Sequence, residues 1–172
     1  MTKDPLEKTS FPRVKLGVSS CLLGQEVRFD GGHKRDRFLI GSLSEFVDYV
    51  PVCPEVAIGL GIPRRPIRLV GDPERPNAVG TVDPTMDVTA RLQAFARETI
   101  PSLGDISGYI LKKDSPSCGM ERVKVYSEKG GAAQRKGQGV FARVLMDRMP
   151  LLPVEEEGRM NDSVLKENFL MR

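Results

Sequence analysis

Three cysteines are the residues of this chain best suited to carry chemistry. Cys21, Cys53 and Cys118 lie in the segments GVSSCLLG, PVCPE and DSPSCG, where glycine, proline or serine borders each of them. Such neighbours are typical of tight turns. Cys53 follows Cys21 by 32 residues and Cys118 follows Cys53 by 65, so the chain has no CxxC pair. An odd number of widely spaced cysteines favours a metal site or a catalytic thiol over a disulfide framework.

The segments that precede the cysteines predict how they are positioned. Each cysteine follows a short apolar run, at residues 14–18, 49–52 and 108–111. Runs of this length, bounded by turn residues, predict buried strands. If the three strands are parallel in one sheet, all three cysteines emerge at its carboxyl edge, where open α/β sheets bind ligands. The pattern therefore predicts that three thiols converge on one site.

Other periodic segments predict the elements that would build and cover such a sheet. Apolar residues recur at helical spacing over residues 87–99, before Pro101 and Gly104, and again over residues 139–149. The glycine-rich residues 128–138 predict a mobile loop. Strands that alternate with helices predict an α/β fold with a parallel sheet covered on both faces. Further short strands are expected at residues 67–70, 123–126 and 151–154.

Length and composition indicate one globular domain. The chain has 172 residues, of which 28% are charged and 40% hydrophobic. It contains no apolar run long enough to span a membrane, and its polar N-terminus has no signal-peptide core. We therefore expect a cytoplasmic protein with reduced cysteines. We expect residues 1–12 to form an arm, residues 13–154 to form the domain that carries the cysteines, and residues 155–172 to form a charged tail with a helix from Asp162.

Positive charge follows the first two cysteines. The net charge is only +3, but basic residues cluster downstream of Cys21 and Cys53, where the expected strands end. Two interpretations stay open: a solvated surface, or a rim around the cysteine edge that binds anions such as the phosphates of a nucleic acid. The basic residues are Arg28, Lys34, Arg35 and Arg37 in the first cluster and Arg64, Arg65 and Arg68 in the second.

Several chemistries are compatible with three cysteines. A buried cysteine is often only a small apolar side chain, but all three occur in turns at strand ends. A structural zinc site needs four ligands, and His33, the one histidine, is available as the fourth. A catalytic cysteine with His33 as its base is another alternative, which leaves two cysteines without a role. Three cysteines can also hold a [4Fe–4S] cluster with one open iron, a Lewis acid suited to a sulfur-containing substrate.

Four motifs, in this order, resemble the thiouracil desulfidase family, long catalogued only as a domain of unknown function. They are SSCLLG with VRFDGG (residues 19–24 and 27–32), CPE with GLGIPR (53–55 and 59–64), LK with SPSCG (111–112 and 115–119), and GQGVFA (137–142). The resemblance covers residues 13–150. It implies a Rossmann-like three-layer α/β sandwich and a [4Fe–4S] cluster held by Cys21, Cys53 and Cys118. The implied reaction removes sulfur from a thiolated pyrimidine, such as 2- or 4-thiouracil, without net redox chemistry.

The C-terminal segment carries a second resemblance. Residues 152–162 are similar to those of longer, two-domain relatives, for which the implied substrate is 4-thiouridine in transfer RNA. Residues 155–172 are then either the tail of a single-domain member or the start of a linker to an absent second domain. Together with the basic residues, this resemblance favours thiolated RNA over the free base as the substrate.

The same motifs suggest roles for further side chains. We expect water to replace the sulfur of a thiocarbonyl that the open iron polarises, with Glu55, two residues after Cys53, as general base or proton shuttle. Ser115 and Ser117 flank Pro116 and are candidates to orient the water or relay a proton. The resemblance implies one glutamate and one serine at these motifs. Asp30, His33, Lys34 and Arg64 are the candidate substrate-binding residues, although residues 30–32 are also typical of a simple turn.

A different class of function stays open beside this hypothesis. Three cysteines and a basic surface are also compatible with a metal-stabilised module that binds nucleic acid, or has a structural role, without catalysis. The two hypotheses differ in the metal, because the first requires an iron–sulfur chromophore and the second a colourless zinc ion.

Overall fold

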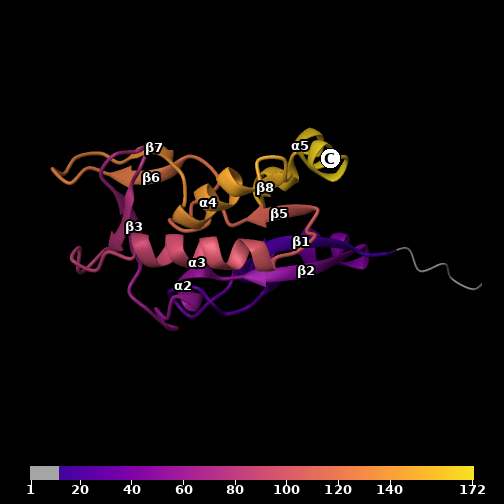
Figure 1. Cartoon of the computed structure of the whole chain (residues 1–172), viewed down its shortest axis with the longest axis horizontal. Helices are drawn as coiled ribbons and strands as arrows, with labels where there is room; N and C mark the ends of the chain where they lie inside the picture. Colours follow the sequence, from indigo (N-terminus) through magenta and orange to yellow (C-terminus); the bar gives the residue numbers. More distant parts are fainter. Residues whose placement is uncertain (1–11) are drawn as a thin grey trace, which may run out of the picture.

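A four-stranded parallel sheet forms one half of the framework (Figure 1). The computed structural model describes residues 12–172, so nearly all of the expected arm at residues 1–12 lies outside the described residues. The strands of this sheet are β1 (Val14–Ser19), β2 (Val47–Val52), β5 (Gly108–Leu111) and β8 (Val154–Glu156). Their order is β2-β1-β5-β8, and every neighbouring pair is parallel.

A second, mixed sheet forms the other half. Its strands are β3 (Ile67–Val70), β4 (Asn77–Gly80), β6 (Val123–Tyr126) and β7 (Gln134–Gly137). Their order is β4-β3-β6-β7, with β3 and β6 parallel and the two outer strands antiparallel to their neighbours. The prediction of a mobile loop at residues 128–138 is therefore wrong for its second half. The side chains of β7 are mostly exposed, and its pairing with β6 keeps it extended.

Helices cover both faces of the parallel sheet. They are α1 (Arg37–Ile40), α2 (Pro54–Ala57), α3 (Thr89–Ser102), α4 (Val140–Arg148) and α5 (Ser163–Leu170), with 3₁₀ turns η1 (Ser20–Leu23), η2 (Leu43–Glu45) and η3 (Arg159–Asn161). Tyr109 of β5 packs in one core with α3 and α4, and the next residue, Ile110, packs in another with Leu39 of α1 and Phe169 of α5. Figure 1 shows α3 running across the molecule from β3 towards β1. This layering confirms the expected Rossmann-like sandwich with a mainly parallel central sheet.

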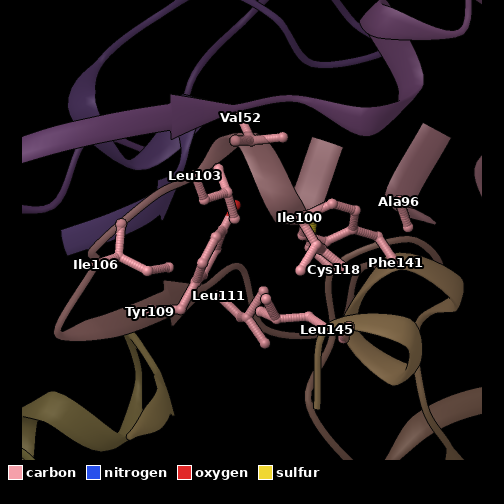
Figure 2. Close-up of a cluster of buried hydrophobic side chains, with 11 residues drawn as sticks. Val52, Ala96, Ile100, Leu103, Ile106, Tyr109, Leu111, Cys118, Phe141 and Leu145 are labelled. Carbon is pink, nitrogen blue, oxygen red and sulfur yellow. The ribbon is translucent and has the colours of Figure 1, made fainter. Parts of the chain in front are cut away.

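Tyr109 lies at the centre of the core between the parallel sheet and α3 (Figure 2). Its side chain is fully buried and covers Gly17 of β1, where an added side-chain carbon would come within 2.2 Å of the ring. Only glycine leaves room for this contact. Figure 2 shows the tyrosine reaching towards Val52 of β2. The packing therefore links the three strands whose ends carry the cysteines.

Two element boundaries differ from the predictions. Helix α3 continues past Pro101, which lies inside its last turn, because Ile100 and Leu103 on either side are buried in the core. The strand expected at residues 151–154 lies later, at β8, where Glu155 and Glu156 are buried despite their charge. β8 thus lies across residue 154, where the sequence predicts the end of the domain. The domain boundary itself stays a prediction.

Helix α5 begins where the sequence predicts. Asp162 caps it by accepting hydrogen bonds from the backbone N–H groups of Val164 and Leu165. Further along the helix, Phe169 packs against Gly108 of β5 and so covers the second face of the sheet. None of the helices within residues 12–172 is long and apolar enough to cross a membrane.

The strand order brings the three cysteine-bearing loops to one edge. β1 has β2 on one side and β5 on the other. The chain therefore adds strands first on one side of β1 and later on the other, and the loops after these three strands meet at this topological switch point. Open α/β sheets bind ligands at the carboxyl ends of strands at such a point. Cys21 and Cys53 follow β1 and β2 closely, and Cys118 lies in the loop after β5. The predicted parallel arrangement of the three strands is confirmed.

Candidate active site

A cavity of about 420 Å³ lies at the carboxyl edge of β1, β2 and β5. This volume is typical of small-molecule sites. All three cysteines contribute to its wall, although they are far apart in the sequence. Of the expected site residues, those that line the cavity are Cys21, Cys53, Cys118, Glu55, Ser115, Ser117, Lys34 and Arg64.

The local sequence explains how the first two cysteines reach the cavity. Cys21 lies in the turn η1 directly after β1, and Gly24, with a φ of +91°, ends that turn. Cys53 immediately precedes helix α2, and Pro54 occupies the first helical position, where its fixed φ and missing N–H are favourable. The first turn of α2 then carries Glu55. The CPE motif therefore places a thiol and a carboxylate at the same wall of the cavity.

Helix α4 holds the loop that carries Cys118. Backbone N–H groups in its first turn donate to the carbonyl oxygens of Pro116 and Ser117 at 2.9 to 3.1 Å. Gly139, just before the helix, lies so close that an added side-chain carbon would come within 2.5 Å of the Ser117 carbonyl. The GQGVFA motif is thus explained by packing, since glycine lets the start of α4 approach and fix this loop.

The three thiols are shielded from solvent, which opposes their ionisation. Burial raises the pKa of Cys21 to about 11 and that of Cys118 to about 12, and it also raises the pKa of Cys53. At Cys21 the positive charge of Lys112 partly opposes the effect of burial, so the pKa of this thiol rises less than burial alone would raise it. Protonated thiols are weak nucleophiles, whereas a coordinated metal ion favours the thiolate. The cavity therefore favours metal ligation over a free catalytic thiol.

Glu55 is held on both of its carboxylate oxygens. Nε and Nη2 of Arg64 donate to Oε2 at 3.1 and 2.9 Å, and Oγ of Ser117 donates to Oε1 at 2.8 Å. The ion pair is largely buried, with 12% of the Glu55 side chain and 6% of the Arg64 side chain exposed. Arg64 also donates to the carbonyl oxygens of Val27 and Gly61. Arg64 thus orients the carboxylate and leaves Oε1 to the serine.

Ser115 and Ser117 form a hydrogen-bond chain that ends at Glu55. Their hydroxyl oxygens are 3.1 Å apart. Because Ser117 gives its single hydroxyl proton to Glu55, Ser115 must be the donor between the two serines. Oγ of Ser115 in turn accepts from the backbone N–H groups of Ser117 and Cys118, at 3.3 and 3.0 Å. The chain therefore has a direction, from Ser115 through Ser117 to the carboxylate.

Two of the expected site residues lie apart from the cavity wall. Asp30 is exposed and accepts from the backbone N–H of Gly32, which lowers the pKa of Asp30 and closes a simple turn. His33 is exposed, and its Nδ1 accepts from the backbone N–H of Arg35. Across residues 12–172, no three His, Cys, Asp or Glu side chains lie close enough to hold a single metal ion. The described structure therefore gives no support to a Cys₃His zinc site or to a cysteine paired with His33.

Lys112 is a cavity residue that belongs to the LK motif but was given no role in the sequence analysis. It lines the cavity, only 16% of its side chain is exposed, and it forms an ion pair with Glu157, the residue after β8. The available signal was position, because Lys112 directly follows β5 in the way that Cys53 directly follows β2. Residues just beyond the carboxyl ends of parallel strands are those that meet ligands.

The fold and the cavity define an α/β protein with a thiol-rich candidate active site beside a Glu–Ser–Ser hydrogen-bond chain. Comparison with known families agrees with this class: the model described as 2-thiouracil desulfurase matches residues 16–157, most of the chain. The chain belongs to the 2-thiouracil desulfurase family.

Two similar proteins support the family assignment. The uncharacterized protein YbbK of Bacillus subtilis (strain 168) is 32% identical over 151 residues, which cover 84% of this chain and 97% of that protein. A solved structure described as the [4Fe-4S]-dependent thiouracil desulfidase TudS is similar with a TM-score of 0.64 and 30% identity. That likeness covers 91% of this chain and 99% of the other. The resemblance seen in the sequence motifs is thus confirmed at the level of the family.

Proposed function

We propose that this protein is a [4Fe–4S]-dependent desulfidase that converts the C=S group of a thiolated uracil into C=O and releases sulfide. The observation that carries the proposal is the convergence of Cys21, Cys53 and Cys118 on one cavity that Glu55 also lines. Family membership supports a thiolated pyrimidine as the substrate class. The similar solved structure is described as [4Fe-4S]-dependent, which supports the same cofactor here.

The donor set of the cavity fits an iron–sulfur cluster. Thiolates are the ligands that such clusters require, and Cys21, Cys53 and Cys118 would hold the cluster with one iron left open. Ligation would also account for two buried thiols and one half-buried thiol at positions where ionisation is otherwise unfavourable. When bound, the cluster supplies a Lewis acid that polarises the thiocarbonyl group.

The hydrogen-bond chain provides the proton transfers that the reaction needs. Exchange of sulfur for oxygen consumes a water molecule and moves protons, but no electrons. Both serines line the cavity, and Ser117 is buried whereas Ser115 is half-buried, so a water in the cavity would reach Ser115 first. A proton given to Ser115 passes to Ser117 and on to Glu55, which Arg64 holds in place. Glu55 is thus the proposed general base, with the two serines as its relay.

Anaerobic purification tests the cofactor and the reaction together. We expect a brown protein with the visible absorbance of a [4Fe–4S] cluster, which converts 2- or 4-thiouracil into uracil with release of an equal amount of sulfide. Protein stripped with a chelator should be inactive and should regain activity when the cluster is rebuilt. A colourless, zinc-containing protein without turnover would instead favour the alternative of a metal-stabilised structural or nucleic-acid-binding module.

Cluster loading of metal-free protein should become faster as the pH rises. Burial raises the pKa of Cys21 to about 11 and of Cys118 to about 12, so both thiols are protonated at neutral pH, and raising the pH increases the thiolate fraction that binds iron. The initial loading rate should rise by up to about tenfold per pH unit from neutral to mildly alkaline pH. Visible absorbance after anaerobic addition of ferrous iron and sulfide measures the rate, with a protein-free blank as control. A rate that does not change over this range contradicts the prediction.

We propose that the substrate of this site is thiolated RNA, and more specifically 4-thiouridine in transfer RNA. Residues 152–162 resemble the two-domain relatives for which that substrate is implied. Arg28 and Lys34 line the cavity, and Arg65 is exposed, so positive charge is available beside the site. Arg64 contributes less to this rim, because Glu55 and two backbone carbonyls take its donors.

Turnover of thiolated transfer RNA should fall steeply with salt, because phosphate contacts release counterions, whereas turnover of free 4-thiouracil should change little. Both substrates are assayed side by side at low and moderate salt. Arg65→Glu should lower RNA turnover and leave thiouracil turnover unchanged, and Lys129→Glu, a charge reversal on the exposed loop before β7, serves as the matched control. Equal salt slopes for both substrates, with Arg65→Glu without effect on RNA, would rule out the basic rim.

A further inference from the structure

Lys112 is a cation with few exposed atoms in a cavity that three cysteines line. Its Nζ donates to the carbonyl oxygen of Lys113 at 2.9 Å and to Oε1 of Glu157. The two side chains of the ion pair are 16% and 15% exposed. Backbone contacts fix the same segment, since the N–H of Lys112 donates to Ser19 Oγ at 3.0 Å and that of Lys113 to Glu157 Oε2 at 2.8 Å. The ammonium group is therefore held at the ends of β1, β5 and β8.

The ammonium group of Lys112 has a donor to spare. A lysine has three N–H donors, and among the described residues only Lys113 and Glu157 accept from this one. The other cations at the cavity differ. Lys34 and Lys113 are exposed. Arg64 is bound to Glu55 and two carbonyls, and Arg28 is held less firmly, at 3.6 Å from Asp30 and over the ring of Phe29. Lys112 is thus the restrained, mostly buried cation with a free donor.

The proposed reaction creates a need for such a group. Both carbon–sulfur bonds of C=S break, a carbon–oxygen double bond forms with the oxygen of water, and sulfur departs as hydrosulfide with one proton left on the protein. No electrons are gained or lost. An anion in a poorly solvated cavity is costly unless a positive charge or a hydrogen-bond donor faces it. Lys112 lines the same cavity as the three cysteines, so its positive charge is available where the sulfur would depart.

We infer that Lys112 is a further catalytic residue, which binds the departing sulfur as hydrosulfide, and that Glu157 is the residue that positions it. This inference rests on the proposed desulfidation. Glu157 acts only through Lys112 and the backbone of Lys113, because its two oxygens accept from those groups. By holding Lys112 and the backbone of Lys113, Glu157 keeps Lys112 at the wall of the cavity.

Titration with sodium sulfide in the absence of thiouracil tests the inference. Cluster-loaded wild-type protein and variants of matched cluster content are titrated anaerobically at mildly alkaline pH, and the dissociation constant of hydrosulfide is read from the visible absorbance. Lys112→Met should raise that constant by about 10- to 100-fold, the usual scale for a hydrogen bond to a charged group. Lys112→Arg should lose less, and Glu157→Gln should show an intermediate rise at unchanged cluster content, which a merely structural role would not produce.

Two further variants make the result decisive. Lys112→Gln keeps a donor and removes only the charge, so it should weaken hydrosulfide binding even if Lys112→Met does not hold the cluster. Lys15→Met is the matched control: Lys15 pairs with Asp105 at 2.9 Å at the opposite end of β1, and hydrosulfide affinity should not change.

The outcomes separate this inference from the proposed function. Neutral variants at position 112 that bind hydrosulfide as tightly as wild type, or an equal weakening in Lys15→Met, would overturn the role of Lys112 while desulfidation stands. Wild-type protein that binds hydrosulfide through Lys112 but forms no uracil would support the anion site and contradict the proposed function.

Discussion

Replacing any one of the three cavity cysteines by alanine should remove the bound cluster and abolish desulfidation. A cluster with three protein ligands has no spare thiolate, and the three cysteines of the cavity are all that the chain contains. The expected result for Cys21→Ala, Cys53→Ala and Cys118→Ala is colourless protein without measurable uracil formation. Iron content, acid-labile sulfide and visible absorbance measure the cluster, and uracil release measures the activity.

The control for this experiment is the fold of the metal-free proteins. Alanine is smaller than cysteine by one sulfur atom, so each variant should keep the circular dichroism spectrum of stripped wild type, with a modest loss of thermal stability at the buried positions Cys21 and Cys118. Loss of the cluster can then be assigned to the missing ligand. Full activity in any one of the three variants would show that its cysteine is not a required ligand.

Glu55→Gln should keep the cluster and lower turnover by about 10²- to 10⁴-fold, the usual scale for a general acid–base group. Glutamine preserves the shape of the side chain and can still accept from Ser117, but it cannot take up the proton that the serine chain delivers. Turnover of 4-thiouracil per cluster, at saturating substrate, is the quantity to compare with wild type.

Ser117→Ala is the companion variant, because it interrupts the hydrogen-bond chain in the middle. It should also lower turnover at full cluster content, and combining it with Glu55→Gln should add little, since residues that act as one unit are not additive. If Glu55→Gln instead loses the cluster and shows normal turnover for each cluster that remains, Glu55 is a structural residue of the cysteine loop.

The sequence predicts the strands whose apolar side chains are buried in the core. It fails for a strand that forms because its backbone pairs with a neighbouring strand. Residues 108–111 are all buried, and residues 123–126 bury Val123 and Val125 on one face of their strand. Both strands were predicted with the bounds that the structure shows. Gln134 to Gly137 contain polar side chains that stay exposed, and they are a strand because of their backbone bonds to β6, which composition does not reveal. Glu156 was expected to lie in the charged tail, yet it belongs to β8 and is buried with its carboxylate bonded to the N–H of Met120.

For the candidate active site, too, the sequence predicts some features and misses others. The convergence of the cysteines followed from a topological rule about strand ends, and the CPE and SPSCG motifs placed Glu55, Ser115 and Ser117 at the same edge. The partners of these side chains did not follow. The contact of Arg64 with Glu55 depends on the path of the loop between α2 and β3, and the contact of Lys112 with Glu157 depends on β8 lying beside β5. Sequence patterns show which residues share an edge, but not which atoms meet there.

Cys53 follows β2, one of the two outer strands of the parallel sheet. β2 pairs only with β1 among the described strands, and Pro51 within it has no N–H to offer a further neighbour, which suits an outer position. Outer strands with few partners tend to open in local fluctuations. A cofactor that binds only while β1, β2 and β5 lie together makes that opening less favourable, as any ligand of the closed state does. The metal centre would then act as a cross-link of the sheet, so that amide exchange in β2 and retention of the cluster become two measures of one equilibrium.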